Sequence, residues 1–181
     1  MAVSAPALRE ALAAIVGADC LVSDPAALAA LAVDGVPPRA AARPGSGEEV
    51  SRLLALASAE GLHVIPRGSG SSLDCGMPPA RVDLLLDCGR LSAILEHSPE
   101  DMVATVQAGL SLAALGAALG RHRQRFPVDP VGGASRSIGG LLATSATGPL
   151  RFRHGGGRDL LLGVRFVQAD GTSTWGGSKV V

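Results

Sequence analysis

The stretch "HVIPRGSGSSLDCG", residues 63–76, is the most informative in the sequence, because a short apolar run leads directly into a loop rich in glycine and serine. Small residues let successive backbone N–H groups converge on one anion, and serine hydroxyls add further donors. The same composition also suits a surface turn with no ligand. The stretch alone leaves both interpretations open, so the flanking sequence has to decide between a phosphate-binding loop and a connector.

A helix and two strand patterns surround the start of this loop. In "SGEEVSRLLALASAEG", residues 46–61, Ser46 and Glu49 form a capping box, and apolar residues recur at helical spacing. The preceding "RAAARP", residues 39–44, can be extended, and the following "LHVIP", residues 62–66, is typical of a strand. The order strand, helix, strand predicts parallel pairing. The loop then lies at the carboxyl end of a strand, where open α/β sheets bind ligands.

The rest of the chain is predicted to form short helices and strands. Helical spacing and capping residues predict helices at 5–16, 24–33 and 111–120. Strand-like runs lie at 81–87, 92–97 and 102–109, and a turn at Asp170–Gly171 joins two more. We therefore expect an α+β fold with an N-terminal helix in 1–19, a small α/β lobe at about 20–80 and a larger, strand-rich α+β lobe at about 81–181.

Composition excludes several classes of function. Lysine plus arginine equals aspartate plus glutamate at 16 each, and aromatic residues make up 2%, so no nucleic-acid partner is expected. No uncharged apolar run approaches the length of a transmembrane helix, and the N-terminus does not resemble a signal peptide. Cys20, Cys75 and Cys88 have neither disulfide nor metal-site spacing, and the four histidines show no metal-ligand pattern. These features predict a cytoplasmic protein without a metal site.

The loop does not match the common phosphate-binding fingerprints. Gly68 and Gly70 begin a G-x-G-x-x-G pattern, but Leu73 takes the place of the third glycine, and prolines interrupt the helix that should follow. A Walker motif and a hydrolase elbow are also missing. A second stretch, "FPVDPVGGASRSIGGLLATSATG" at 126–148, again offers paired glycines and hydroxyls. Two such stretches about 70 residues apart favour a long cofactor with a central diphosphate over coincidence.

These blocks resemble the FAD-binding domain of the vanillyl-alcohol oxidase and p-cresol methylhydroxylase superfamily. The resemblance covers about residues 20–181 and rests on "PRGSGSS", "VQAG", "DPVGGASRSIGGLLATSATG" and "RHGGGRDLLLGVRFVQADG", in that order. Within the superfamily, the later blocks and the terminal "GGSKVV" are most similar to the FAD-binding subunit of bacterial glycolate oxidase. The resemblance implies a two-lobed domain with extended FAD between the lobes. Superfamily members continue into a cap domain that is absent here, so we expect either a truncated or partial subunit or one for which the rest is supplied elsewhere.

The resemblance also implies which residues bind the cofactor. The first loop is expected to grip the diphosphate through Arg67, Gly68, Ser69, Gly70, Ser71 and Ser72. The second block is expected to line the flavin and ribityl region through Arg136, Ser137, Ile138, Gly139, Gly140, Ala143, Ser145, Ala146 and Gly148. Val164 matches a position whose backbone meets the adenine end.

Several residues depart from the superfamily pattern. Ser145 stands where relatives commonly carry asparagine, Arg136 where they carry a small residue, and His154 where they frequently carry tyrosine. Ser71 occupies the position at which covalent members carry histidine, so the resemblance predicts non-covalent FAD. Asp129, between two prolines, is expected to fix a turn, with a flavin contact as the less favoured interpretation.

What the resemblance implies for function is a FAD-dependent oxidoreductase that oxidises a small 2-hydroxy acid such as glycolate. Electrons would pass to a partner subunit or quinone, and the expected partners are a second flavoprotein and an iron–sulfur subunit, through which the protein would be peripheral at the inner membrane. The sequence does not indicate a catalytic base. Two alternatives stay open: a non-catalytic FAD-binding or assembly subunit, and a fragment of another FAD-linked oxidase such as a D-lactate dehydrogenase.

Overall fold

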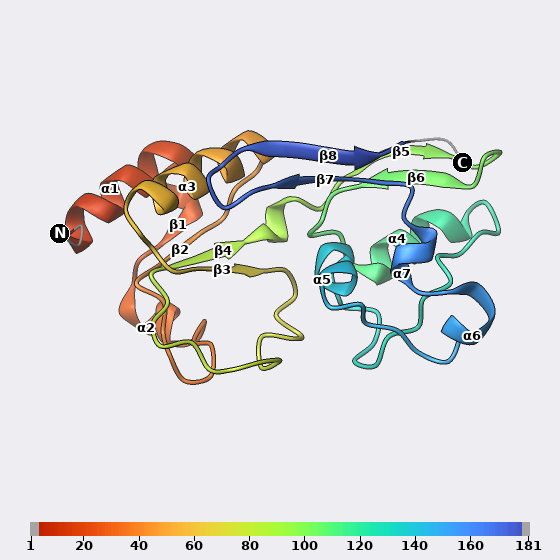
Figure 1. The fold of residues 1–181 in the computed structure, drawn as a ribbon, viewed down its shortest axis with the longest axis horizontal. Coiled ribbons are helices and arrows are strands. Elements are labelled where there is room, and N and C mark those ends of the chain that lie inside the picture. Colours follow the sequence, from red (N-terminus) through yellow and green to blue (C-terminus); the bar gives the residue numbers. More distant parts are fainter. Residues whose placement is uncertain (1–3, 179–181) are drawn as a thin grey trace. The chain divides into compact units, whose positions relative to one another are not determined.

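The computed structural model describes residues 4–178, which form two compact units (Figure 1). The first unit contains the described residues up to Arg67, then Leu73–Arg90 and Arg165–Trp175. The second contains Gly68–Ser72, Leu91–Val164 and the described residues from Gly176. The glycine- and serine-rich loop therefore belongs to the second unit, although the strand that precedes it belongs to the first.

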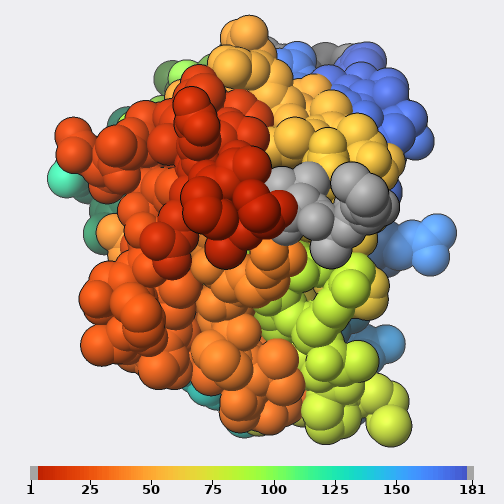
Figure 2. Space-filling view, turned by 90° about the vertical axis from the view of Figure 1, so that its left-hand side faces the viewer, coloured from red at the N-terminus to blue at the C-terminus, as the bar shows by residue number. Residues whose placement is uncertain are grey.

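Two capped helices cover part of the first unit. α1 (Ala5–Val16) begins after Ser4, whose hydroxyl accepts the N–H of Ala7, and ends at Gly17. In α3 (Gly47–Ala59) the Ser46 hydroxyl accepts the N–H of Glu49, as the capping pattern predicts. The Glu49 carboxylate accepts the N–H of Gly45 at 2.7 Å, not that of Ser46, so the second bond of the predicted capping box forms one residue earlier. α1 and α3 contact each other and lie side by side on the face seen in Figure 2.

The sheet of the first unit has the order β1-β2-β4-β3. β1 (Leu21–Val22) pairs antiparallel with β2 (Ala40–Ala42), while β2 and β3 (Val64–Arg67) each pair parallel with β4 (Leu84–Asp87). The expected direct pairing of β2 with β3 is wrong, because β4 lies between them. Leu84, Leu85 and Leu86 are all buried, as a central strand with both faces covered requires.

β4 also changes the division of the chain. The sequence-based boundary near residue 80 assigned this strand to the second lobe, whereas the structure places it at the centre of the first unit's sheet. Short-range patterns predict strands but not their partners, because a parallel partner comes from a distant part of the chain. Leu85 packs with Leu28, Val33 and Ala41 in one buried cluster, which shows that β4 completes this core.

α2 (Pro25–Ala29) is shorter than the predicted helix at 24–33. Asp24 caps it as expected and accepts the N–H of Ala27 at 2.9 Å. The chain leaves the helix after Ala30 and turns through two residues with positive φ, Asp34 (48°) and Gly35 (82°). Left-handed backbone cannot continue a right-handed helix. The residues after Ala29 therefore form a bend, although their apolar residues have helical spacing.

The second unit combines a strand pair with small helices. β5 (Ile94–Ser98) and β6 (Val103–Val106) pair antiparallel, and α4 (Leu112–Gly120) begins after Ser111, whose hydroxyl accepts the N–H of Ala114. α5 (Ile138–Ala143), which the sequence did not predict, packs Ile138 into a cluster with Leu110, Leu115 and Leu119. Short helices α6 (Arg151–His154) and α7 (Gly157–Leu160) follow.

The last two strands form the predicted hairpin. β7 (Gly163–Val167) and β8 (Ser173–Gly177) make a separate two-stranded sheet. At the turn, the N–H of Gln168 donates to the carbonyl of Thr172, and Gly171 has a φ of 89°. Within residues 4–178, no helix is long and apolar enough to cross a membrane, and no group of histidine, cysteine, aspartate or glutamate side chains could hold a metal ion.

Candidate cofactor-binding site

Arg67 is the last residue of β3 and already forms an ion pair with a carboxylate. Its register partner in β4 is Asp87, and Arg67 Nη1 lies 3.6 Å from Asp87 Oδ2. Arg43 Nε lies at the same distance from this carboxylate oxygen. The expected free positive charge at the edge of the loop is therefore shared with Asp87.

The loop itself, Gly68–Ser72, has unused backbone donors. Within the described residues, none of the N–H groups of Ser69–Ser72 donates a hydrogen bond to another part of the protein. Gly70 has a φ of 79°, a conformation that residues with side chains rarely adopt. The Ser69 and Ser71 hydroxyls lie 3.2 Å apart. A run of free N–H and O–H donors is suited to an anion.

The structure brings this loop against the second glycine-rich stretch, 64 positions further along the chain. The guanidinium of Arg136 donates to the hydroxyl of Ser72. Gly68 packs so closely on Ser137 that a Cβ atom at this glycine would overlap the Ser137 hydroxyl oxygen. Two blocks that the sequence singled out separately therefore form one surface within the second unit.

Ser137 organises the second stretch. Its side chain is buried and accepts the N–H of Gly140, and so caps α5. The N–H groups of Ile138 and Gly139 donate to the carbonyls of Leu110 and Ala108, at 2.8 and 2.7 Å. The amides at the start of α5 therefore already have acceptors within the protein. This part of the stretch contributes close packing to the site, and few of its N–H groups are free to bind a ligand.

Gly139 explains why a small residue is needed at this point. A Cβ atom there would lie 2.7 Å from Ala108 Cβ and 2.9 Å from the Ala108 carbonyl oxygen. This approach joins the "VQAG" segment, residues 106–109, to the second stretch. Both segments stand out in the sequence, but their contact does not, because apolar spacing does not identify the partner of a glycine.

The other predicted site residues differ in exposure. Ala143 and Ser145 are exposed, Ala146 is half-buried, and Val164 in β7 is 41% exposed. Within residues 4–178, none of these four forms a hydrogen bond with the first loop. Gly148 adjoins Asp129, where a Cβ atom would lie 2.7 Å from the carboxylate oxygen Oδ1. Their assignment to the cofactor stays a prediction.

Asp129 has a structural role. Its two carboxylate oxygens accept the N–H of Leu150 at 3.1 and 3.3 Å. This pair of contacts ties the start of the second stretch to the segment after Gly148, which is a long-range link and not the local turn that the sequence predicted. The absence of a side chain at Gly148 leaves the space in which Asp129 reaches Leu150.

Two polar atoms of the second unit are buried without a partner among the described residues: Arg136 Nε and His154 Nε2. Among the other histidines, His63 contributes its backbone N–H, which donates to Asp83. The ring of His97 has a side-chain partner, since its Nε2 lies 3.1 Å from Gln124 Oε1. The His122 ring packs edge-on against that of His97 at 5.0 Å.

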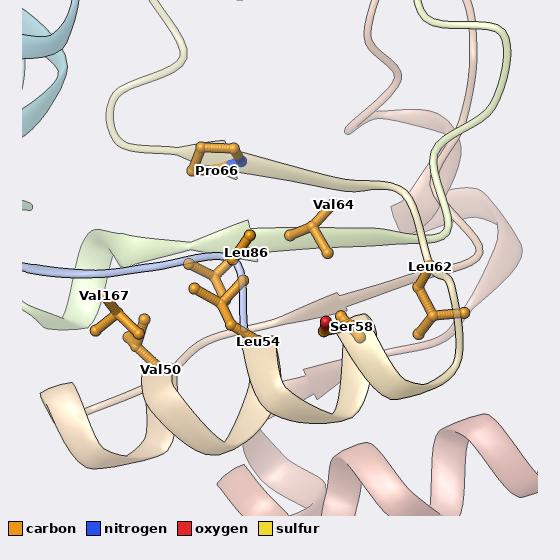
Figure 3. Close-up of a pocket in the computed structure, with 10 residues that line it drawn as sticks. Val50, Leu54, Ser58, Leu62, Val64, Pro66, Leu86 and Val167 are labelled. Carbon is orange, nitrogen blue, oxygen red and sulfur yellow. The ribbon is translucent and has the colours of Figure 1, made fainter. Parts of the chain in front are cut away.

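An apolar pocket of about 480 Å³ lies elsewhere, between α3 and the sheet of the first unit. In Figure 3, Leu54 of α3 and Leu86 of β4 point toward each other across it. Its lining residues are uncharged: Val50, Leu54, Ala57, Ser58, Leu62, Val64, Pro66, Leu86, Val167 and Ala169. The pocket therefore offers no cation to a diphosphate.

Ser145 adopts a strained backbone conformation, with a φ of 49°. Asparagine tolerates this left-handed region better than serine does. We therefore expect Ser145→Asn to raise the free energy of unfolding by about 0.5 kcal/mol and Ser145→Val to lower it by about 1 kcal/mol. Urea unfolding of both variants measures this; equal stabilities would contradict it.

Comparison with known proteins identifies the fold. Residues 38–177 match the FAD binding domain family. The chain is 37% identical over 134 residues to D-2-hydroxyglutarate dehydrogenase from Xanthomonas citri pv. viticola, covering 74% of this chain and 28% of that protein. It is 31% identical over 143 residues to glycolate oxidase subunit GlcD from Bacillus subtilis, covering 79% and 30% respectively. The chain thus spans less than a third of the length of these relatives.

The solved structure of p-cresol methylhydroxylase matches with a TM-score of 0.70 and 17% identity, over 92% of this chain and 34% of that one. This match confirms the expected α+β fold. The matched family covers both glycine-rich stretches and the contacts between them. The chain therefore belongs to the FAD binding domain family.

Proposed function

We propose that this chain is the FAD-binding portion of an oxidoreductase that oxidises a small 2-hydroxy acid such as glycolate. The observation that carries the proposal is the junction of Gly68–Ser72 with Arg136 and Ser137, inside the segment that matches the family. The choice of substrate class is supported by two relatives whose names refer to 2-hydroxy acids.

The residues at this junction fit FAD. The free N–H groups of Ser69–Ser72 and the unpartnered Nε of Arg136 are donors, and a diphosphate supplies only acceptors. Gly68, which has no side chain, leaves the loop backbone close to Ser137. Arg67 contributes less, since Asp87 already neutralises part of its charge.

When bound, FAD would supply hydride-accepting redox chemistry for a substrate carbon that bears a hydroxyl group. The chain's own contribution is to bind and orient the cofactor through the first loop and the packed second stretch. Neither stretch presents a residue that we assign as the catalytic base. We propose that groups outside these two stretches bind the substrate in the whole oxidase.

We further propose that FAD is bound non-covalently, because Ser71 stands where covalent members of the superfamily carry histidine. The proposed partners are a second flavoprotein and an iron–sulfur subunit, which receive the electrons. A cytoplasmic location, peripheral at the inner membrane through these partners, accords with free thiols at Cys20, Cys75 and Cys88.

Cofactor binding can be tested directly. The purified protein, incubated with excess FAD and then desalted, is expected to retain about one FAD per chain. Acid precipitation should release all of this flavin as intact FAD. Loss of all flavin on desalting, with no binding in titration, would contradict the proposed function. Flavin that precipitates with the protein would contradict the non-covalent mode.

The substrate class needs a separate measurement. The protein in complex with its co-purified partners is mixed anaerobically with glycolate, D-lactate or D-2-hydroxyglutarate, and loss of the oxidised-flavin absorbance is followed. We expect one of these acids to reduce the flavin while acetate, which lacks the hydroxyl, does not. A flavin that all three acids leave oxidised would contradict the 2-hydroxy acid assignment.

A further inference from the structure

Arg136 joins the two stretches of the candidate site. Its Nη1 donates to the carbonyl of Val131 at 2.6 Å, and its Nη2 donates to the hydroxyl of Ser72. Nε is buried and has no acceptor within the described residues. A guanidinium has five N–H donors, and leaving a buried one unpaired costs about 1–3 kcal/mol. The free Nε–H therefore calls for an acceptor from outside this part of the chain.

The charge of Arg136 points to the same kind of partner. The ion pairs found in residues 4–178 engage Arg39, Arg43, Arg67 and Arg81, and none of them involves Arg136. Its side chain is half-buried, so part of the guanidinium has lost hydration without gaining a carboxylate. An anion would compensate this loss through a charge-assisted hydrogen bond.

The position of Arg136 beside the first loop indicates which anion it would bind. Ser72, which it contacts, ends the run of residues whose N–H groups have no acceptor in the described protein. Gly132, with a φ of 93°, lies on the other side, where a Cβ atom would be 3.3 Å from Nη1. A ligand that accepts from the Ser69–Ser72 amides would lie next to this guanidinium.

We propose that Arg136 binds a phosphate group of the FAD diphosphate and, through Ser72, holds the first loop against the second stretch. This inference rests on the proposed function, and it assigns the contact to a residue that replaces a small one in the superfamily pattern. A purely structural clamp would account for the bonds of Nη1 and Nη2. It would not account for a buried, charged and unpaired Nε–H.

The test compares ligands that share or lack the diphosphate. Dissociation constants for FAD, ADP and riboflavin are measured for the parent protein, Arg136→Ala and Arg136→Lys. Arg125→Ala is the matched control, because Arg125 is an exposed arginine of the same unit with no bond in the described structure. Riboflavin carries the flavin and ribityl chain without a phosphate, whereas ADP carries the diphosphate together with adenosine and no flavin.

We expect Arg136→Ala to weaken both FAD and ADP about tenfold or more, as loss of a charge-assisted hydrogen bond does. Arg136→Lys should recover part of the loss, because it keeps the charge but not the planar fork. Riboflavin affinity and the Arg125→Ala variant should be unchanged. If ADP affinity is the same in all variants, or riboflavin weakens as much as FAD, the inference is wrong.

The proposed function and this inference fail differently. A parent protein that binds none of the three ligands refutes the FAD proposal and the inference with it. A parent protein that binds FAD while Arg136→Ala and Arg136→Lys bind it equally well refutes only the role of Arg136. Should Arg136→Ala not fold, the ratio of ADP to riboflavin affinity in Arg136→Lys decides: a loss confined to ADP supports the inference, and an unchanged ratio overturns it.

Discussion

Gly68→Ala is expected to weaken FAD binding by about 100-fold, which corresponds to roughly 2.7 kcal/mol. The added Cβ atom would overlap the hydroxyl oxygen of Ser137, which is buried and caps α5. Either the first loop moves away from the second stretch or Ser137 loses its contact with Gly140. The first outcome displaces the donors that are proposed to bind the diphosphate, and the second loosens the stretch against which the loop packs. Fluorescence titration with FAD measures the effect.

Gly116→Ala provides the matched control. Gly116 is exposed in α4, and a Cβ atom there would have no neighbour within 4 Å. Alanine in a helix interior stabilises the helix by up to about 1 kcal/mol relative to glycine, so this variant should unfold at a slightly higher temperature. Its FAD affinity should equal that of the parent protein. Equal affinities for Gly68→Ala and Gly116→Ala would show that the contact with Ser137 does not shape the site.

The second large effect is expected at Asp83, which is 3% exposed in the first unit. Its carboxylate lies 3.2 Å from Arg39 Nη1 and 3.1 Å from Arg81 Nε, and it accepts the N–H of His63 at 2.9 Å. We expect Asp83→Ala to lower the free energy of unfolding by about 2–3 kcal/mol, mainly through the unpaired amide. The value stays below that of a fully buried pair because both arginines are partly exposed.

The same carboxylate makes stability depend on pH. Burial on its own would raise the pKa of Asp83, but the His63 amide, Arg39 and Arg81 together hold it below its usual 3.8. The folded protein thus binds the proton more weakly than the unfolded chain, so the stabilisation is complete well above pH 3.8 and declines as the pH falls through the folded pKa. Asp83→Ala should flatten this acid dependence.

Urea unfolding at several pH values between neutral and acid tests both statements. Asp101→Ala is a suitable control, because Asp101 is exposed and forms no bond in the described structure. It should unfold like the parent protein at each pH. An Asp83→Ala variant as stable as the control at neutral pH would refute the role given to the His63 amide and the two arginines.

The starts of three helices were predictable, because a helix cap depends on neighbours in the chain. Ser4, Ser46 and Ser111 each accept a backbone N–H three residues further on, and the three helices begin where these serines indicate. The place of β4 was not predictable in this way. Its three consecutive leucines fit any buried strand, and only the pairing with β2 and β3 across the chain made it central.

The candidate site shows the same division. Sequence patterns selected both glycine-rich stretches, since runs of glycine and serine stand out locally. They did not show that the amides at the start of α5 donate to Ala108 and Leu110, which leaves the first loop as the source of free donors. Nor could they show the bridge from Arg136 to Ser72, because a side-chain bond between distant residues has no local signature.

These contacts predict different behaviour for the two stretches when FAD binds. This difference is measured most directly by hydrogen exchange of the backbone amides, monitored by mass spectrometry with and without FAD. The Ser69–Ser72 amides have no acceptor in the described protein and should exchange fast alone and much more slowly with FAD. The Ile138 and Gly139 amides should be protected in both states. If FAD binds but leaves exchange at Ser69–Ser72 unchanged, the first loop does not hold the cofactor and the central claim is wrong.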